Sequence, residues 1–190
     1  MLASVNQGFA MKTRRITCAL LLLALAGTAL GDATDEFATL LDDHWQWQLR
    51  NAPVMASMMG DRRYNREWSD SSIGAIEQRH KDEREFLRRT YAIDRASLSA
   101  ADQLNHELFR RQLQDNVDQF RFNGHLMPFS QRGGVQSLDG LTNQLRLATV
   151  EDFDDWLARL GKIDVVIDQT IALAESGRKS GMMPARVIME

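Results

Sequence analysis

The sequence is poor in cysteine and in proline, and each shortage excludes something. The single cysteine, Cys18, lies in an apolar N-terminal run, so the rest of the chain can build neither a disulfide framework nor a cysteine zinc site. Phosphate-binding glycine loops and Gly-x-Ser-x-Gly nucleophile elbows are also absent. The motifs that most readily identify an enzyme are therefore missing. The only prolines are Pro53, Pro128 and Pro184, which leaves long segments open to helix formation.

The first 31 residues are typical of a secretory signal peptide. A basic start at residues 11–15 precedes an apolar run at residues 16–25 and then small residues, which favours cleavage before Asp32. Residues 1–10 carry no charge, so the methionine of the basic stretch is an alternative start. A membrane anchor is the competing interpretation, but the apolar run is shorter than the roughly 20 residues of a membrane-spanning helix. We expect an exported protein, periplasmic or extracellular, with no stable membrane span after cleavage.

The charge balance of the predicted mature chain argues against nucleic acid as a partner. Removing residues 1–31 removes three basic residues and no acidic one, which leaves 20 basic against 26 acidic residues, a formal charge of −6. A nucleic-acid-binding domain shows the opposite excess. The remaining length, residues 32–190, is enough for one hydrophobic core.

Apolar residues recur every three or four positions along most of the chain, which predicts an all-α, antiparallel array of helices. The third helix is expected to begin at the capping residue Ser99, and the fifth at Thr149 with an apolar face that includes Phe153 and Leu157. Gly177 and Gly181 are expected to end the fifth helix. The predicted helices cover residues 37–51, 73–91, 100–122, 138–147, 150–174 and a short start after Pro184.

The apolar helix start after Pro184 has two interpretations. One interpretation is the opening of a helix that needs further protein to pack against, which predicts that residues 32–190 are the N-terminal portion of a larger helical domain. The other is a frayed tail. The residues alone do not favour one over the other.

The histidines are the candidate metal ligands, and each has a plainer interpretation. His106-Glu107 imitates the start of the zinc motif His-Glu-x-x-His, but Arg110 stands where the second histidine should be, and a guanidinium has no lone pair for a metal. We therefore predict no metal site and place His106 and Glu107 on a helix surface. His44 is predicted to be packed in the interior, and His80 to lie in a solvated run of charges.

Two non-helical stretches, residues 59–65 and 128–136, combine glycines with polar side chains, as functional loops often do. With the features around them they form an ordered set: Pro53, Ala56, Gly60-Asp61-Arg62, Tyr64-Asn65, Asp70-Ser71, Pro128, Gln131, Gly133, Gly134, Gln136, the stretch Asp152 to Leu160 with its Arg159-Leu160, Gly181 and Pro184. This set is similar to the bacterial domain-of-unknown-function 885 family, and the resemblance covers about residues 34–190.

The resemblance implies an exported, all-helical protein similar to zinc metallopeptidases, with a His-Glu-x-x-His motif later in the family domain than the residues present here. No zinc ligand or catalytic glutamate carries over, so we expect a non-catalytic N-terminal helical segment that needs no cofactor of its own. Its partner would be a peptide substrate of the full-length parent. Gln131, Gly133, Gly134 and Gln136 are the candidate cleft-lining residues. The alternative is a complete small periplasmic helical module that binds a partner and has no enzymatic activity; a third, membrane-tethered bundle requires an uncleaved leader.

Overall fold

The computed structural model describes residues 33–130 and 133–189. The predicted signal peptide and Gln131 lie outside the described residues. Within them the protein is all-α, as predicted: there is no strand, and only one isolated bridge, between Ser130 and Gly133. None of the helices in this part of the chain has the length and hydropathy to cross a membrane.

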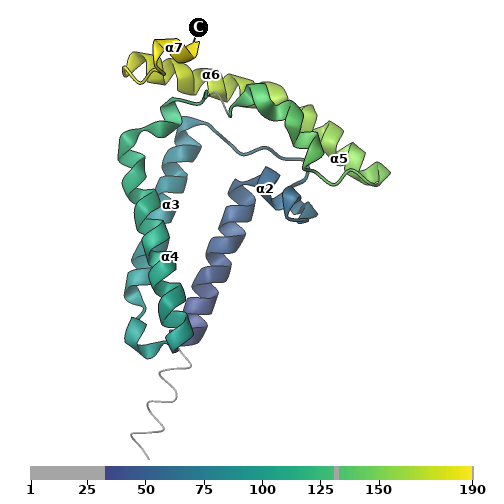
Figure 1. Ribbon diagram of the computed structural model, residues 1–190. Coiled ribbons are helices and arrows are strands. Elements are labelled where there is room, and N and C mark those ends of the chain that lie inside the picture. The colour runs from purple at the N-terminus through teal and green to yellow at the C-terminus, as the bar shows by residue number, and fades with distance from the viewer. Residues whose placement is uncertain (1–32, 131–132, 190) are drawn as a thin grey trace, which may run out of the picture.

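The helices form two groups (Figure 1). In one, α3 (Ile73–Ala92) and α4 (Ala100–Gln119) run antiparallel. The first helix, residues 33–51, approaches them at the end of the pair that lies farthest from α5 (Val150–Leu160) and α6 (Ile163–Lys179). In the other, α5 and α6 lie across the opposite end. The α-helices after the first are α2 (Pro53–Met58), α3 (Ile73–Ala92), α4 (Ala100–Gln119), α5 (Val150–Leu160), α6 (Ile163–Lys179) and α7 (Arg186–Met189). The 3₁₀ turns are η1 (Arg62–Tyr64), η2 (Arg95–Ser97), η3 (Phe120–Phe122), η4 (Gly124–Leu126) and η5 (Val135–Asn143).

Side-chain caps fix the helix starts that the sequence predicts. The Ser99 hydroxyl accepts a hydrogen bond from the backbone N–H of Asp102, and Thr149 forms a reciprocal capping box with Asp152. Pro53 occupies the first turn of α2, directly after the first helix ends. The segment after α4 ends at Asn123, whose φ of 51° is left-handed. These boundaries are local, and local residue chemistry predicts them correctly.

Two predicted helices differ from the structure. The segment predicted as a helix over residues 138–147 is the 3₁₀ turn η5 followed by a loop, as the glycine and β-branched residues of this stretch allow. The helix predicted over residues 150–174 breaks at Gly161 into α5 and α6. Gly177 does not end α6, which continues to Lys179; a Cβ at Gly177 would collide with the backbone carbonyl of Leu126 in η4. Gly177 is therefore required for close packing of α6 on η4.

The core lies where the first helix, α3 and α4 meet. Phe37 and Leu40 pack there with Phe86, Leu87 and Leu113, all nearly or fully buried. By the usual allowance of about 1.5–3 kcal/mol for each large apolar side chain taken out of water, these contacts are the main source of stability for this group.

The structure corrects two predictions for histidines and confirms a third. His106 is buried, not on the surface, because its face of α4 meets α3 and its Nε2 lies 2.9 Å from the carbonyl oxygen of Thr90. His80 is partly buried and stacks on Phe120 with ring centroids 3.9 Å apart. His44 is buried in the interior, as predicted, with edge contacts to the rings of Phe86 and Phe109.

Candidate functional site

Helix α5 is amphipathic, but its polar face is the buried one. Asp152, Asp155 and Arg159 lie at spacings of three and four residues and are only 4%, 8% and 1% exposed. Val150 and Leu157 on the apolar stripe are 79% and 64% exposed. This reverses the ordinary arrangement, in which the apolar stripe of a helix faces the protein.

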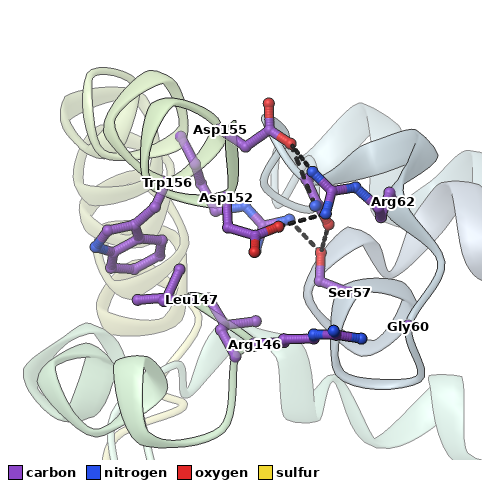
Figure 2. A pocket seen from close by; sticks show the side chains of 11 residues that line it. Ser57, Gly60, Arg62, Arg146, Leu147, Asp152, Asp155 and Trp156 are labelled. Carbon is purple, nitrogen blue, oxygen red and sulfur yellow. Dashed lines mark hydrogen bonds and ion pairs between the residues drawn. The ribbon is translucent and has the colours of Figure 1, made fainter. Parts of the chain in front are cut away.

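The buried stripe is held by the connection between α2 and α3 (Figure 2). Asp152 forms an ion pair with Arg62, the arginine of the Gly60-Asp61-Arg62 motif. Asp155 accepts hydrogen bonds from Arg66 Nε at 2.7 Å and from Asn65 Nδ2 at 3.3 Å, and lies 3.7 Å from Arg62. Figure 2 shows both carboxylates on the α5 side, facing Arg62 and Ser57 across the gap between the two segments. Ion pairs and hydrogen bonds between oppositely charged groups thus join α5 to the α2–α3 connection, which lies far from it in the sequence.

Arg159 is the most deeply buried member of the network. Its NH2 group donates to the Ser57 hydroxyl at 2.7 Å and to the Tyr64 carbonyl oxygen at 2.9 Å. The guanidinium also lies over the Trp68 ring, 5.7 Å from its centroid. Its Nε has no hydrogen-bond partner within the described residues. Burial lowers the pKa of Arg159 from its ordinary value, although a guanidinium remains charged in proteins.

The contact continues past the end of α5. The Trp68 indole N–H donates to the carbonyl oxygen of Arg159 at 2.7 Å, and Lys162 pairs with Glu67 at 2.7 Å. On α6, the side chain of Gln169 bonds both the backbone N–H of Ser71 and the carboxylate of Asp70. We call this whole set, residues 57–71 against residues 152–169, the arginine–carboxylate clamp. The clamp includes most of the residues between Gly60 and Ser71 that carry the family resemblance.

A cavity of about 90 Å³ lies within the clamp, lined by Arg62, Arg146, Asp152, Trp156 and Arg159 among others. Its volume is that of a few water molecules, well below the range of roughly 300–1,000 Å³ found for ligand pockets. The cavity has room for only a few water molecules.

The clamp carboxylates are poorly suited to acid–base catalysis near neutral pH. Hydrogen bonds from the backbone N–H of Ala148 and from Thr149, with the charge of Arg62, lower the pKa of Asp152 to about 2. The hydrogen bond from Arg66 lowers the pKa of Asp155. A general base works best when its pKa lies near the operating pH. Structural support is what this arrangement provides.

A zinc ion does not fit the described residues. No group of three or more His, Cys, Asp or Glu side chains in residues 33–130 and 133–189 is arranged to hold a metal. His106, the first residue of the zinc-like motif, is engaged with the Thr90 carbonyl, and Arg110 pairs with Glu107 at 2.6 Å instead of offering a ligand.

Three of the four candidate cleft residues, Gly133, Gly134 and Gln136, lie at the start of the 3₁₀ turn η5. The Gln136 side-chain amide donates to the carbonyl oxygens of Ser130 and Gly133, at 2.9 and 3.1 Å. Gly134 has a φ of 141°, and a Cβ on it would collide with the Gln136 side chain. The turn lies outside the linings of the clamp cavity and of the apolar groove described below. A role for Gly133, Gly134 and Gln136 in a cleft stays a prediction, as does that of Gln131.

Sequence reasoning gave no site role to Asp152, Asp155 or Ser57, because apolar periodicity was used to choose the inward face of α5. A usable signal was present. The spacing of Asp152, Asp155 and Arg159 places one basic and two acidic side chains on one helix face, and the 57–71 connection is rich in arginine. Buried charges need partners of opposite sign, so the two segments match each other.

The fold and the clamp together define an all-helical protein whose α2–α3 connection is tied by charge to a later helix pair. Residues 53–190, more than half of the chain, match the family described as bacterial protein of unknown function (DUF885), and the chain belongs to this family. The match begins at Pro53, so the first helix lies outside it, whereas the resemblance was expected to begin at about Thr34. No curated protein and no solved structure matches the chain.

Proposed function

We propose that this chain is a non-catalytic helical scaffold of an exported zinc-metallopeptidase-like protein, one that supplies part of the wall of a peptide-binding cleft. In such an arrangement the metal and its water-activating glutamate would be supplied by other residues of that protein. The chain's own contribution is to hold helices in place and to present surfaces.

The observation that carries this proposal is the exposed apolar stripe of α5, which consists of Val150, Phe153 and Leu157. The stripe is exposed because the clamp fixes the opposite face inward. Contiguous apolar surface on a protein usually marks a site of contact with other protein. Helix α6 also exposes apolar side chains, including Ile167. Further helices of a larger helical protein are suitable partners for such a surface, since helices pack through apolar stripes.

Export is supported by the N-terminal segment and by the lack of cysteine after Cys18. A basic start, an apolar run and small residues before Asp32 make up the three parts of a signal peptide. A chain without cysteine beyond its leader is unaffected by an oxidising compartment.

The proposal is tested on purified full-length protein by metal analysis and peptide hydrolysis. After dialysis against zinc and then against buffer, we expect substoichiometric zinc and no cleavage of a mixture of fluorogenic peptides. One tightly bound zinc per chain, together with hydrolysis that a chelator abolishes and zinc restores, would contradict the scaffold assignment. Replacing His106 by Gln serves as the matched control, because residual zinc should not depend on it.

A second function, a helical binding module without an enzymatic relative, is favoured by one feature. The first helix, α3 and α4 enclose a core of their own, formed by Phe37, Leu40 and Leu113 among others. A binding module should unfold in one cooperative step and bind little hydrophobic dye, whereas a scaffold with an uncovered stripe should bind dye while folded. Thermal unfolding followed by circular dichroism, with dye fluorescence measured alongside, separates the two.

A further inference from the structure

An apolar groove of about 250 Å³ lies on the opposite side of α6 from the clamp contacts, between the C-terminal half of that helix and two extended segments. Its floor is formed by Ile171 and Ala174. The other uncharged lining residues, 126–129 and 182–184, which we call the two walls, contribute a leucine, two prolines, a phenylalanine and three methionines. Gly177 fixes the distance between the floor and the first wall, because only glycine lets α6 approach the Leu126 carbonyl so closely. The close approach of α6 to η4 therefore depends on the backbone at this position.

The charges at the groove are few and are arranged along one helix face. Arg178 and Glu175 are the only charged residues in the lining, and they lie one turn apart. Among the described residues, neither forms an ion pair, so both are available to a ligand. The segment from Glu175 to Arg186 carries three basic residues against one acidic residue, although the whole chain has a net charge of −3. This stretch of the chain is thus basic in an acidic protein.

These features select a ligand by size and by charge. A volume of about 250 Å³ is below the usual range for whole drug-sized ligands and suits one or two bulky apolar side chains. Methionine and phenylalanine walls adapt to side chains of different shape. A guanidinium at the edge pairs best with a carboxylate, which it can bind through two parallel hydrogen bonds. Glu175 is exposed and can accept a hydrogen bond, and the backbone N–H groups of a peptide are suitable donors.

We propose that this groove binds the C-terminal end of a peptide, with a bulky apolar side chain between the methionine and proline walls and the terminal carboxylate on Arg178. A fatty acid would satisfy the apolar walls and Arg178, but it has no N–H to offer Glu175, which favours a peptide. This inference deepens the proposed function, since it rests on a peptide-binding role for the chain and names the part of the peptide that is recognised.

The test compares two peptides on full-length protein by titration calorimetry or ligand-observed NMR. Acetyl-Ala-Leu-Phe with a free carboxylate should bind at least about tenfold more tightly than its C-terminal amide, a difference of about 1.4 kcal/mol. Arg178→Gln should reduce binding of the acid to the level of the amide, and Ile171→Asp should abolish binding of both. Arg88→Gln is the control, because Arg88 is an exposed arginine on α3, paired with Glu85 and outside the groove lining.

Each remaining outcome overturns the proposal. Recognition of a peptide C-terminus is excluded if the acid and the amide bind equally, or if the Arg178→Gln variant still prefers the acid. It is also excluded if neither peptide binds at about 5 mM, a concentration at which a binding free energy near −3 kcal/mol would still be detected. Tighter binding of decanoate than of the acid peptide assigns the groove to fatty acids instead. Zinc content and hydrolysis are separate measurements, so a scaffold that fails this test is distinguished from a chain that is not a scaffold.

Discussion

Replacing Arg159 by Met tests whether the clamp holds the two helix groups together. Methionine fills much of the apolar volume but removes the charged donor from the Ser57 hydroxyl and the Tyr64 carbonyl, at 2.7 and 2.9 Å. Each hydrogen bond from a charged group contributes about 1.5–3 kcal/mol, and the unpaired Nε offsets part of the sum. We therefore expect a loss of about 3 kcal/mol in the free energy of unfolding.

The assay is urea unfolding followed by circular dichroism, with thermal unfolding alongside. For a protein of this size about 3 kcal/mol corresponds to a fall in Tm of roughly 6–12 °C. The control is Arg88→Met, which removes an exposed ion pair on α3 and should leave stability essentially unchanged. If Arg159→Met is no more destabilising than this control, the clamp does not contribute the stability assigned to it here.

Three further predictions concern packing and pH. Gly177→Ala should destabilise the protein by about 1–3 kcal/mol in urea unfolding, because the new Cβ meets the Leu126 carbonyl. Gly74→Ala is the control: nothing lies near its Cβ, so it should stabilise α3 by up to about 1 kcal/mol. A Gly177→Ala variant that is more stable than the unsubstituted protein would refute the close packing. Because the pKa of Asp152 is low, its contribution to the free energy of unfolding is complete above about pH 4 and is lost as the pH falls towards 2. Asp152→Asn should therefore lose less stability than the unsubstituted protein when both are titrated with acid. An unchanged acid titration would argue against the ion pair. Burial lowers the pKa of His44, so the imidazole takes up a proton more readily in the unfolded chain than in the folded one. Stability should therefore fall as the pH drops below about 6.5. His44→Leu should make this fall of stability with pH less steep, and an identical pH dependence would contradict the burial of a neutral imidazole.

Helix boundaries were predictable because they depend on neighbouring residues. Ser99 and Thr149 cap helices through hydrogen bonds that span three residues, and Pro53 restricts the residue before it. The failures at Gly177 and His106 lie where distant parts of the chain meet. Gly177 looks like a helix terminator until the Leu126 carbonyl is seen beside it, and His106 looks exposed until α3 is placed against its face of α4.

The orientation of α5 shows the same limit for the candidate site. Apolar periodicity identifies the helix but does not say which face turns inward. That choice depends on Arg62 and Arg66, about 90 residues earlier in the sequence, which neutralise Asp152 and Asp155 and let the polar face be buried. The ordered motifs of the family resemblance were visible in the sequence, but their joint role in one clamp required the fold.

The central claim is that α5 turns its apolar stripe outward, and thiol labelling of a single introduced cysteine measures this directly. In a Cys18→Ser background the chain has no other cysteine, so Leu157→Cys reports on the stripe and Ala56→Cys, at a fully buried position in α2, gives the protected reference. We predict that the thiol at position 157 reacts with a maleimide nearly as fast as in urea-unfolded protein, while the thiol at position 56 is strongly protected. Protection at position 157 equal to that at position 56 would show that the apolar stripe faces inward and would contradict the account.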